Sequence, residues 1–151
     1  MPCPATPWAK SPNRSCVIMQ NNNTARMERD LSFSQEDFQR FARLSGDHNP
    51  IHVDPDYAAG TRFGATVSHG MLLFSAVRGL IHEFFPGARL EVQDLKFPAP
   101  AYADEPLTVV LETRGRPVDG IVHLTTDVLK EDDSRCLQGT CRLKLDQEMA
   151  P

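Results

Sequence analysis

The stretch MLLFSAVRGLIHEFF, residues 71–85, is the longest nearly apolar run of the chain. On a helix its apolar side chains cover most of the circumference, and a helix of this kind must be enclosed by other elements. The remaining polar positions form one narrow stripe, made of Ser75, Arg78 and His82. Ser68 is the candidate N-cap and Pro86-Gly87 ends the pattern, so the sequence predicts one long enclosed helix.

Only strand patterns follow this helix. Apolar and polar residues alternate over 90–97, 107–111, 122–128 and 137–145. The first of these runs slips at Gln93-Asp94, which is typical of a β-bulge. Alternation indicates strands with one buried face, and the four runs predict a meander.

Upstream of the long helix, a short strand at 31–33 leads into a second helix. Ser34 followed by Asp37 resembles a capping box, which marks the start of that helix. Its apolar face ends at Gly46.

A third, shorter helix is predicted from Asp54-Pro55 to Gly60. The helix before it cannot continue through residues 47–52, because Pro50 pushes the preceding residue toward extended geometry. One early strand, an enclosed helix and four later strands together predict an α+β fold, with an antiparallel sheet wrapped around a single helix.

The composition excludes two classes of protein. The chain of 151 residues carries 16 Lys and Arg against 20 Asp and Glu, a net charge of −4, whereas a nucleic-acid binder needs a basic surface. No run approaches the ~18 consecutive apolar residues of a membrane span. We therefore expect one domain with neither a nucleic-acid nor a membrane partner.

We expect this domain to span residues 27–151 and residues 1–26 to lie outside it. The leading stretch is free of acidic residues, contains Pro2, Pro4, Pro7 and Pro12, and lacks the apolar core of a secretory signal. It is interpreted as a disordered tail or as an over-long gene start, with Met19 or Met27 as the true first residue. An organelle transit peptide is the less favoured alternative, since prolines disrupt an amphipathic helix.

The four cysteines do not form a disulfide framework. Cys3 and Cys16 lie in the leading stretch, and Cys136 and Cys141 are five positions apart, which puts them on opposite faces of an extended strand. Neither a local disulfide nor a CxxC metal site follows. Reduced thiols indicate a cytoplasmic location, with a mitochondrial or other organelle matrix as the alternative.

The segment between the second helix and the long helix carries the candidate chemistry. It contains FARLSGDHNPIH at 41–52 and SHGM at 68–71. A zinc-protease motif is excluded, because Pro50 interrupts any helix between His48 and His52 and no glutamate follows His48. A calcium loop that begins at Asp47 is excluded as well, because its sixth position, where glycine is required, is His52.

Both stretches resemble the hydratase-2 motif of the MaoC-like family, the (R)-specific enoyl-CoA hydratases and 3-hydroxyacyl-thioester dehydratases. The resemblance covers residues 27–145 and implies a hot-dog fold, a homodimer, no metal and no redox cofactor. It makes Asp47 and His52 the catalytic pair. It assigns Asn49 to the turn or to substrate contact, and the backbone N–H of Gly70 to the thioester oxygen.

The function that this resemblance implies is the reversible hydration of trans-2-enoyl thioesters to (R)-3-hydroxyacyl thioesters of coenzyme A or acyl carrier protein. A carboxylate and an imidazole can hold one water molecule between them and move its proton. The free N–H groups and the positive end of a helix can stabilise the negative charge that develops on the thioester oxygen.

Two other functions remain open, because one fold hosts many activities. One is a non-catalytic hot-dog subunit, or an acyl-binding partner of a dehydratase, which would have no need for both Asp47 and His52. The other is a hot-dog thioesterase, which would not need the Asp-x-Asn-Pro-Ile-His turn.

Several further residues carry weaker expectations. His48 is predicted to face solvent and His69 to have a structural role. Arg78 is a large cation within the enclosed helix, and we expect it either to reach a carboxylate of a dimer partner or to narrow the acyl pocket. The candidate contacts for coenzyme A phosphates are Arg62, Arg89 and Lys96.

Overall fold

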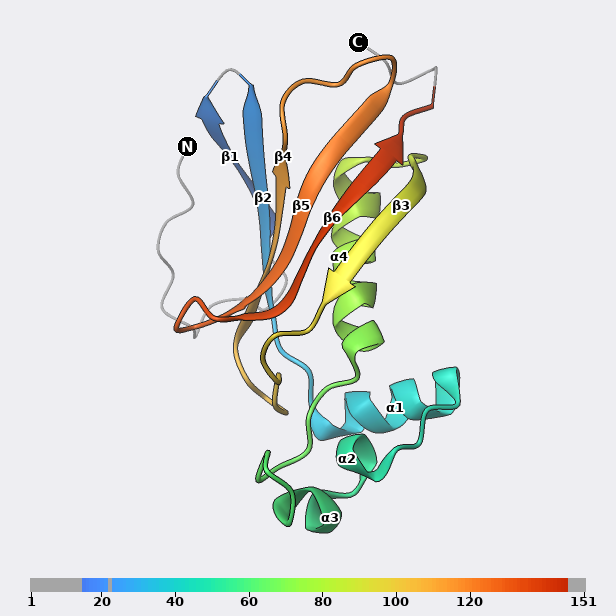
Figure 1. Cartoon of the computed structure of the whole chain (residues 1–151), viewed down its shortest axis with the longest axis vertical. Coiled ribbons are helices and arrows are strands. Elements are labelled where there is room, and N and C mark those ends of the chain that lie inside the picture. The colour runs from blue at the N-terminus through green and yellow to red at the C-terminus, as the bar shows by residue number, and fades with distance from the viewer. Residues whose placement is uncertain (1–14, 22, 147–151) are drawn as a thin grey trace.

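The structure, a computed structural model, describes residues 15–21 and 23–146, and in this part six strands form one sheet around a long helix (Figure 1). The strands are β1 (Ser15–Asn21), β2 (Thr24–Leu31), β3 (Arg89–Lys96), β4 (Leu107–Thr113), β5 (Ile121–Lys130) and β6 (Arg135–Lys144). The helices are α1 (Gln35–Ser45), α2 (Pro50–Val53), α3 (Pro55–Ala59) and α4 (Gly70–Phe84).

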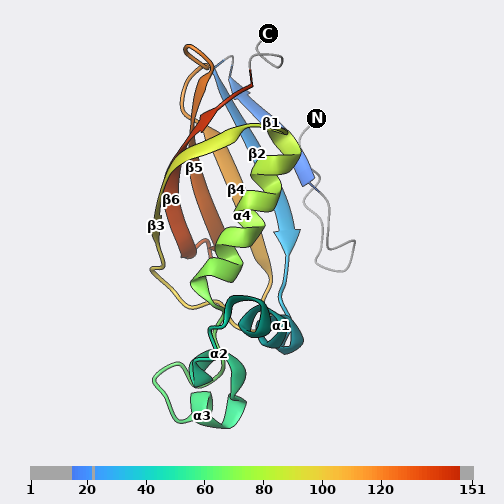
Figure 2. The same ribbon diagram turned by 90° about the vertical axis from the view of Figure 1, so that its right-hand side faces the viewer.

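The sheet order is β1-β2-β4-β5-β6-β3, and every neighbouring pair is antiparallel. The predicted α+β class, with an antiparallel sheet wrapped around one long helix, is confirmed. The predicted meander holds for β4, β5 and β6 but is wrong for β3, which pairs with β6 at the edge of the sheet. Helix α4 crosses the sheet, so that β3, which follows it, lies at the edge beyond β6 (Figure 2). The prediction failed because alternation along a strand shows which face is buried and does not show which strand is its neighbour.

Helix α4 lies across the concave face of the sheet (Figure 2). The side chains that it buries there are Leu72, Leu73, Val77, Leu80 and Ile81. Its other face carries the exposed residues Ser75, Gly79 and His82, and Met71 is 52% exposed. The predicted enclosure is therefore one-sided in this single chain, because the sheet covers only the face that packs against it.

The helices before α4 begin and end where their caps predict. Ser34 and Asp37 form a reciprocal capping box at the start of α1, and Gly46, with a φ of 80°, ends that helix. Asp54 caps α3 with its side chain. The additional turn α2 starts at Pro50, whose fixed φ suits the first position of a helix.

The start of α4 differs from the prediction. Its N-cap position is His69 rather than Ser68, and the side chain of His69 makes no capping bond. The backbone N–H of Ser68 donates to the carbonyl of Ala101 at 2.8 Å, and its hydroxyl donates to the carbonyl of His69 at 3.0 Å. These bonds hold Ser68 one residue before the cap position. The imidazole of His69 is only 2% exposed and lies in the protein interior.

The predicted tail over residues 1–26 is wrong for its second half. Strand β1 and the first part of β2 lie there and pair with each other, from Ser15 opposite Arg29 to Asn21 opposite Thr24. Main-chain pairing with β2, and of β2 with β4, stabilises this edge, and Met27 of β2 is buried in the core. Residues 1–14 lie outside the described residues.

The pairing is irregular between β1 and β2, between β3 and β6, and between β5 and β6, and the last two irregularities bear on the predicted strands. In β3 the register shifts between Leu90 and Val92, earlier than the predicted slip. In the pairing of β5 with β6, a second shift leaves Cys136 as the extra residue. Because a bulge disrupts strict alternation, Cys136 and Cys141 both join the core as free thiols, and the prediction of opposite faces is wrong.

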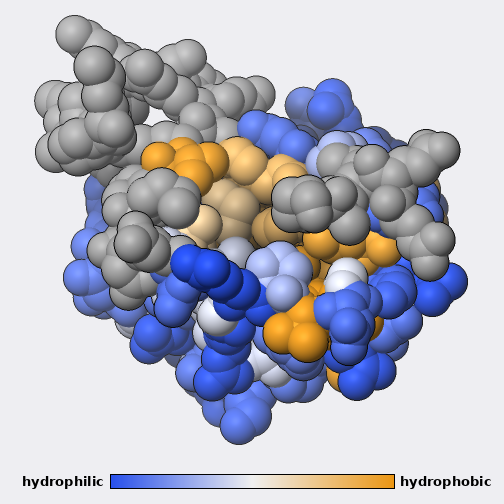
Figure 3. Space-filling model, turned by 90° about the horizontal axis from the view of Figure 1, so that it is seen from above, coloured by the Kyte–Doolittle hydropathy of each residue, from blue (hydrophilic) through white to orange (hydrophobic). Residues whose placement is uncertain are grey.

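The two ends of the molecule differ in character. Helices α1 to α3 cover one end of the sheet, and Figure 3 looks onto the other end, where an apolar area lies within a hydrophilic surround. The partly buried side chains of Phe84 and Phe85, at the end of α4, pack against the core. None of the helices in the described ranges has the length and apolar character needed to cross a membrane.

The close contact between β3 and β6 generates a prediction about stability. A Cβ added at Gly139 of β6 would overlap the backbone carbonyl oxygen of Asp94 on β3. We expect Gly139→Ala to lower the free energy of unfolding by about 1–3 kcal/mol, as measured by urea denaturation.

The matched control is Gly79→Ala on the exposed side of α4. Its added Cβ would meet the Nη1 atom of Arg29 at 3.8 Å, an ordinary contact. Alanine favours a helix over glycine, so this variant should gain up to about 1 kcal/mol. Equal stability of the two variants would contradict the packing described here.

Candidate active site

The turn between α1 and α2 places the carboxylate of Asp47. Its backbone N–H donates to the hydroxyl of Ser45 at 3.2 Å, directly after the left-handed Gly46. Its Oδ1 atom accepts a hydrogen bond from the backbone N–H of Asn49 at 3.2 Å. One carboxylate oxygen therefore stabilises the turn, and the other, Oδ2, remains for chemistry.

Asn49 shapes the same turn. Its side-chain oxygen accepts a hydrogen bond from the backbone N–H of Ile51 at 3.2 Å and caps α2. Asn49 is exposed and does not line the pocket described below. The observed contact is structural, and a contact with substrate stays a prediction.

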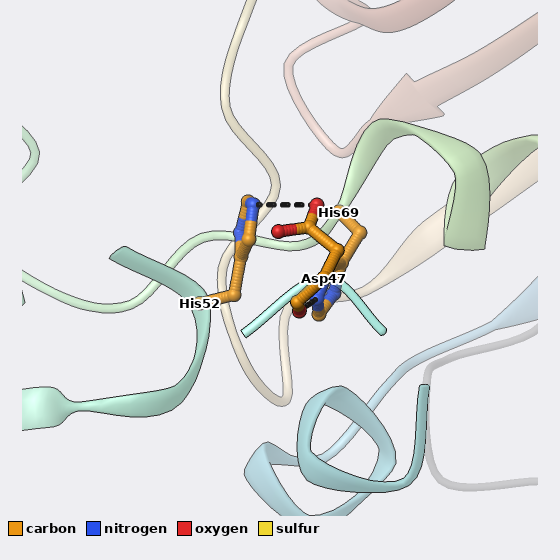
Figure 4. Close-up of side chains that lie close together, drawn as sticks. All are labelled: Asp47, His52 and His69. Carbon is orange, nitrogen blue, oxygen red and sulfur yellow. Dashed lines mark hydrogen bonds and ion pairs between the residues drawn. The ribbon is translucent and has the colours of Figure 1, made fainter. Parts of the chain in front are cut away.

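The imidazole of His52 is oriented by a backbone carbonyl. Its Nδ1 atom lies 2.8 Å from the carbonyl oxygen of Val67. A carbonyl can only accept, so Nδ1 carries the proton and Nε2 has a free lone pair. Nε2 lies 3.8 Å from Oδ2 of Asp47 (Figure 4). The His52 side chain is 14% exposed and that of Asp47 is 53% exposed, so a sheltered base faces a solvated carboxylate.

The separation of this pair suits a shared water molecule. A distance of 3.8 Å is longer than a direct hydrogen bond, but one water molecule can lie at hydrogen-bond distance from both atoms. Both groups can accept a proton from that water and return it. The sequence predicts that Asp47 and His52 come together, and the structure places their side chains face to face.

The start of α4 presents free amides. Within the described residues, the backbone N–H groups of Gly70 and Met71 donate to no protein acceptor. They belong to the first turn of a 15-residue helix, where such groups are unpaired and the helix dipole is positive. A Cβ at Gly70 would lie 2.7 Å from Cζ of Phe97, so the aromatic ring covers this glycine closely.

A pocket of about 460 Å³ connects Asp47 with the start of α4. Its walls include Phe41 of α1 and the segments 67–71 and 97–101, and Cys136 lines it as well. Burial raises the pKa of the Cys136 thiol to about 11, so this thiol stays protonated near neutral pH and is no nucleophile.

His69 joins the predicted pair, although the sequence predicts only a structural role for it. Its Nε2 atom lies 3.0 Å from the backbone carbonyl oxygen of Asp47. Its ring stacks on that of His52, with centroids 4.0 Å apart and an interplanar angle of 27°. Burial is the main cause that lowers the pKa of His69 below its ordinary value. Its only signal in the sequence is its position directly before Gly70.

The three side chains are also close enough to be considered as a metal site. Asp47, His52 and His69 each offer a ligand atom within 4.8 Å of the others. The lone pairs of the stacked imidazoles lie in two nearly parallel planes, whereas zinc needs ligands that converge on one point. Each imidazole also uses one nitrogen to donate to a backbone carbonyl. The arrangement therefore suits proton transfer better than tetrahedral coordination.

The remaining residues singled out in the sequence differ in whether they line the pocket. Arg62 lines the pocket, with its guanidinium 4.7 Å from the ring centroid of Phe63, whereas Arg89 and Lys96 on β3 are not among the residues that line it. His48 is exposed. Arg78 does not line the pocket, so it does not narrow it. Its Nη1 atom is buried without a hydrogen-bond partner among the described residues.

The chain resembles known proteins of one family, both by a family model and by pairwise similarity. Residues 19–133 match the model of the MaoC like domain. The chain is 34% identical over 116 residues to the (R)-specific enoyl-CoA hydratase of Aeromonas caviae, a match that covers 75% of this chain and 87% of that enzyme. It is 42% identical over 79 residues to the mitochondrial 3-hydroxyacyl-[acyl-carrier-protein] dehydratase of Arabidopsis thaliana, covering 52% of this chain and about half, 48%, of that protein.

Solved structures share the architecture. The (R)-hydratase from A. caviae involved in PHA biosynthesis superimposes with a TM-score of 0.78 at 30% identity, covering 85% of this chain and 100% of that one. The R-hydratase PhaJ1 from Pseudomonas aeruginosa gives a TM-score of 0.75 at 30% identity, with 80% and 79% covered. The hot-dog fold implied by the sequence motif is thereby confirmed.

The burial of His69 generates a prediction about pH. Its pKa is lowered from 6.5 in the folded protein, so below that pH the unfolded chain binds more protons than the folded one. The folded state should therefore lose stability as the pH falls. We expect the urea midpoint to decrease from about pH 7.5 to about pH 5.5, and to decrease less in His69→Gln. Equal slopes for the two proteins would contradict this prediction.

The stacking of His52 and His69 generates a prediction about metal. We expect the purified protein, after dialysis, to retain no stoichiometric zinc when measured by plasma mass spectrometry, because stacked imidazoles in nearly parallel planes do not suit tetrahedral coordination. One equivalent of zinc that is lost in His69→Phe would show instead that the cluster is a metal site.

Proposed function

Because this chain belongs to the family of MaoC-like domain proteins, we propose that it catalyses the reversible hydration of trans-2-enoyl thioesters to (R)-3-hydroxyacyl thioesters. The relatives named above are hydratases and dehydratases, so the enzyme class is hydro-lyase. Dehydration of a 3-hydroxyacyl thioester is the reverse reaction and uses the same groups.

One observation carries this proposal. Oδ2 of Asp47 and Nε2 of His52 face each other at 3.8 Å, and Asp47 lines a pocket together with Gly70, whose amide is free, whereas His52 stands behind Asp47 and is not among the lining residues. Hydration needs a water molecule beside the β-carbon, a proton for the α-carbon and stabilisation of the charge on the thioester oxygen. The three groups correspond to these three needs.

Asp47 and His52 act as a coupled acid/base pair. In the hydration direction the pair accepts a proton from the water molecule while the oxygen of that water bonds to the β-carbon. The pair then delivers a proton to the α-carbon. The C=C double bond becomes single, and no oxidant or reductant takes part. The carbonyl of Val67 keeps the proton of His52 on Nδ1, so that Nε2 is the atom available for transfer.

The first turn of α4 stabilises the thioester oxygen. Negative charge develops on this oxygen as water adds, and the N–H groups of Gly70 and Met71 lie at the positive end of the helix without competing acceptors among the described residues. A preorganised donor of this kind is typically worth about 3 kcal/mol of transition-state stabilisation. The ring of Phe97 lies directly against Gly70, on the side where a Cβ would stand.

The substrate is a thioester of coenzyme A or of acyl carrier protein. The pocket wall near Leu73, Phe97 and Cys136 offers an apolar surface to the acyl chain. Arg62 at the same pocket is the cation placed to meet the phosphorylated carrier arm, which coenzyme A and acyl carrier protein share.

We propose a homodimer as the functional unit. The outer face of α4 is open in the single chain, and the edge strand β3 exposes Val92, which is 49% accessible. A second copy on this side would complete the enclosure that the apolar character of α4 predicts.

A hydration assay with crotonyl-CoA tests the proposal. We expect the purified protein to add water without supplied metal, and Asp47→Asn or His52→Gln to lower turnover by at least about 100-fold, the scale of a lost acid/base group. The measurement is the loss of enoyl absorbance, with chiral analysis of the product.

The matched control is Asp56→Asn, which changes an exposed carboxylate on the neighbouring helix α3 and should leave turnover unchanged. Release of free thiol from acyl-CoA would indicate a thioesterase instead. Inactivity of the wild-type protein in both assays would indicate a non-catalytic subunit and end the hydratase proposal.

A further inference from the structure

His69 occupies the N-cap position of α4, but its side chain does not cap the helix. N-cap positions usually carry side chains that accept a hydrogen bond from the first turn, and His69 makes no such bond. Its imidazole instead lies in the interior, 2% exposed, with the ring edges of Phe41 and Phe38 packed near it at centroid distances of 4.9 and 6.5 Å. The side chain is held where it contacts α1 and α2 rather than its own helix.

One nitrogen of His69 ties down the backbone of Asp47. Nε2 lies 3.0 Å from the Asp47 carbonyl oxygen, which can only accept, so Nε2 carries a proton. The other nitrogen, Nδ1, is buried and has no partner among the described residues. A second proton there would create a buried cation without an acceptor, and burial accordingly lowers the pKa of His69. The imidazole of His69 is therefore neutral, and its one hydrogen bond is the bond that Nε2 donates to Asp47.

The face of the same ring supports the second member of the pair. The imidazoles of His69 and His52 stack at 4.0 Å, and the titratable groups that face His69 are Asp47, His52 and His48. The stacking restricts rotation of the His52 ring, whose Nδ1–H is already bound to the carbonyl of Val67. Ring contact and carbonyl bond together fix the direction of the His52 Nε2 lone pair.

We infer that His69 is a positioning residue, which holds the Asp47 backbone and the His52 ring in the mutual orientation that the reaction requires. Asp47 lies in an exposed turn, and its carbonyl is bound to the protein interior through His69. The inference rests on the proposed function, since it names the residue that aligns the proposed pair. His69 itself need not touch the substrate or exchange a proton.

Two substitutions separate the two contacts of His69. His69→Phe keeps an aromatic ring on His52 but removes the donor to the Asp47 carbonyl. His69→Gln removes the ring but keeps an N–H donor of similar reach. The control is His123→Gln, which changes an exposed histidine on β5.

We expect His69→Phe to lower kcat by about tenfold to a hundredfold, because misplacement of a catalytic group by about 1 Å has effects of this size. KM should change less than kcat, since His69 is only one of the residues that line the pocket and the other walls remain. His69→Gln should retain more turnover than His69→Phe, and His123→Gln should match the wild type. Wild-type kcat in both His69 variants would overturn the inference, as would a loss of activity that only follows the folded fraction in thermal denaturation.

A second measurement keeps this inference separate from the proposed function. If the wild-type protein hydrates no enoyl thioester, the proposed function fails, and ¹⁵N NMR of the His52 imidazole still tests the positioning. We expect a single Nδ1–H tautomer of His52 in the wild type and a mixture of tautomers or ring orientations in His69→Gln. An unchanged His52 spectrum in both variants would overturn the role of His69.

Discussion

The packing of α4 against the concave face of the sheet is the constraint on which the rest of the structure depends. Five apolar side chains of the helix are buried against strands from both halves of the sheet, and this fixes the direction of the helix axis. The first turn of α4 therefore stays at one end of the sheet, where α1 to α3 lie (Figure 1). Unpaired amides at a rigid helix start can stabilise charge because they need no reorganisation.

Backbone carbonyls organise the chemistry around that helix start. The carbonyl of Val67 keeps the proton of His52 on Nδ1, and the carbonyl of Asp47 keeps the proton of His69 on Nε2. Each bond leaves the opposite ring nitrogen without a proton, so the tautomers follow from loop geometry rather than from neighbouring charges. The site thus combines an exposed carboxylate with two sheltered imidazoles, and the stacking of the rings links α2 to the start of α4.

The features that could be predicted from the sequence are those with local causes. The capping box of Ser34, the end of α1 at Gly46 and the cap at Asp54 depend on residues within a few positions of one another. The meeting of Asp47 and His52 was expected from the resemblance of residues 41–52 to the hydratase-2 motif, which lies within one short segment of the chain. The edge position of β3 was not predictable, since it depends on pairing with the distant strand β6. The pairing of β1 with β2 and the bulge at Cys136 lie within pairs of consecutive strands, but neither has a hydrophobic pattern in the sequence that would reveal it.

The sequence by itself determined the α+β class, the long apolar helix and the motif that brings a carboxylate and an imidazole together, because periodicity and turn chemistry act over short distances along the chain. Only the tertiary structure decided that His69 rather than Ser68 occupies the cap position, and that its ring contacts both Asp47 and His52. The physical reason is that the bond from Ser68 to Ala101 and the stacking of two histidines join segments that are far apart in the chain, and no local preference specifies such contacts.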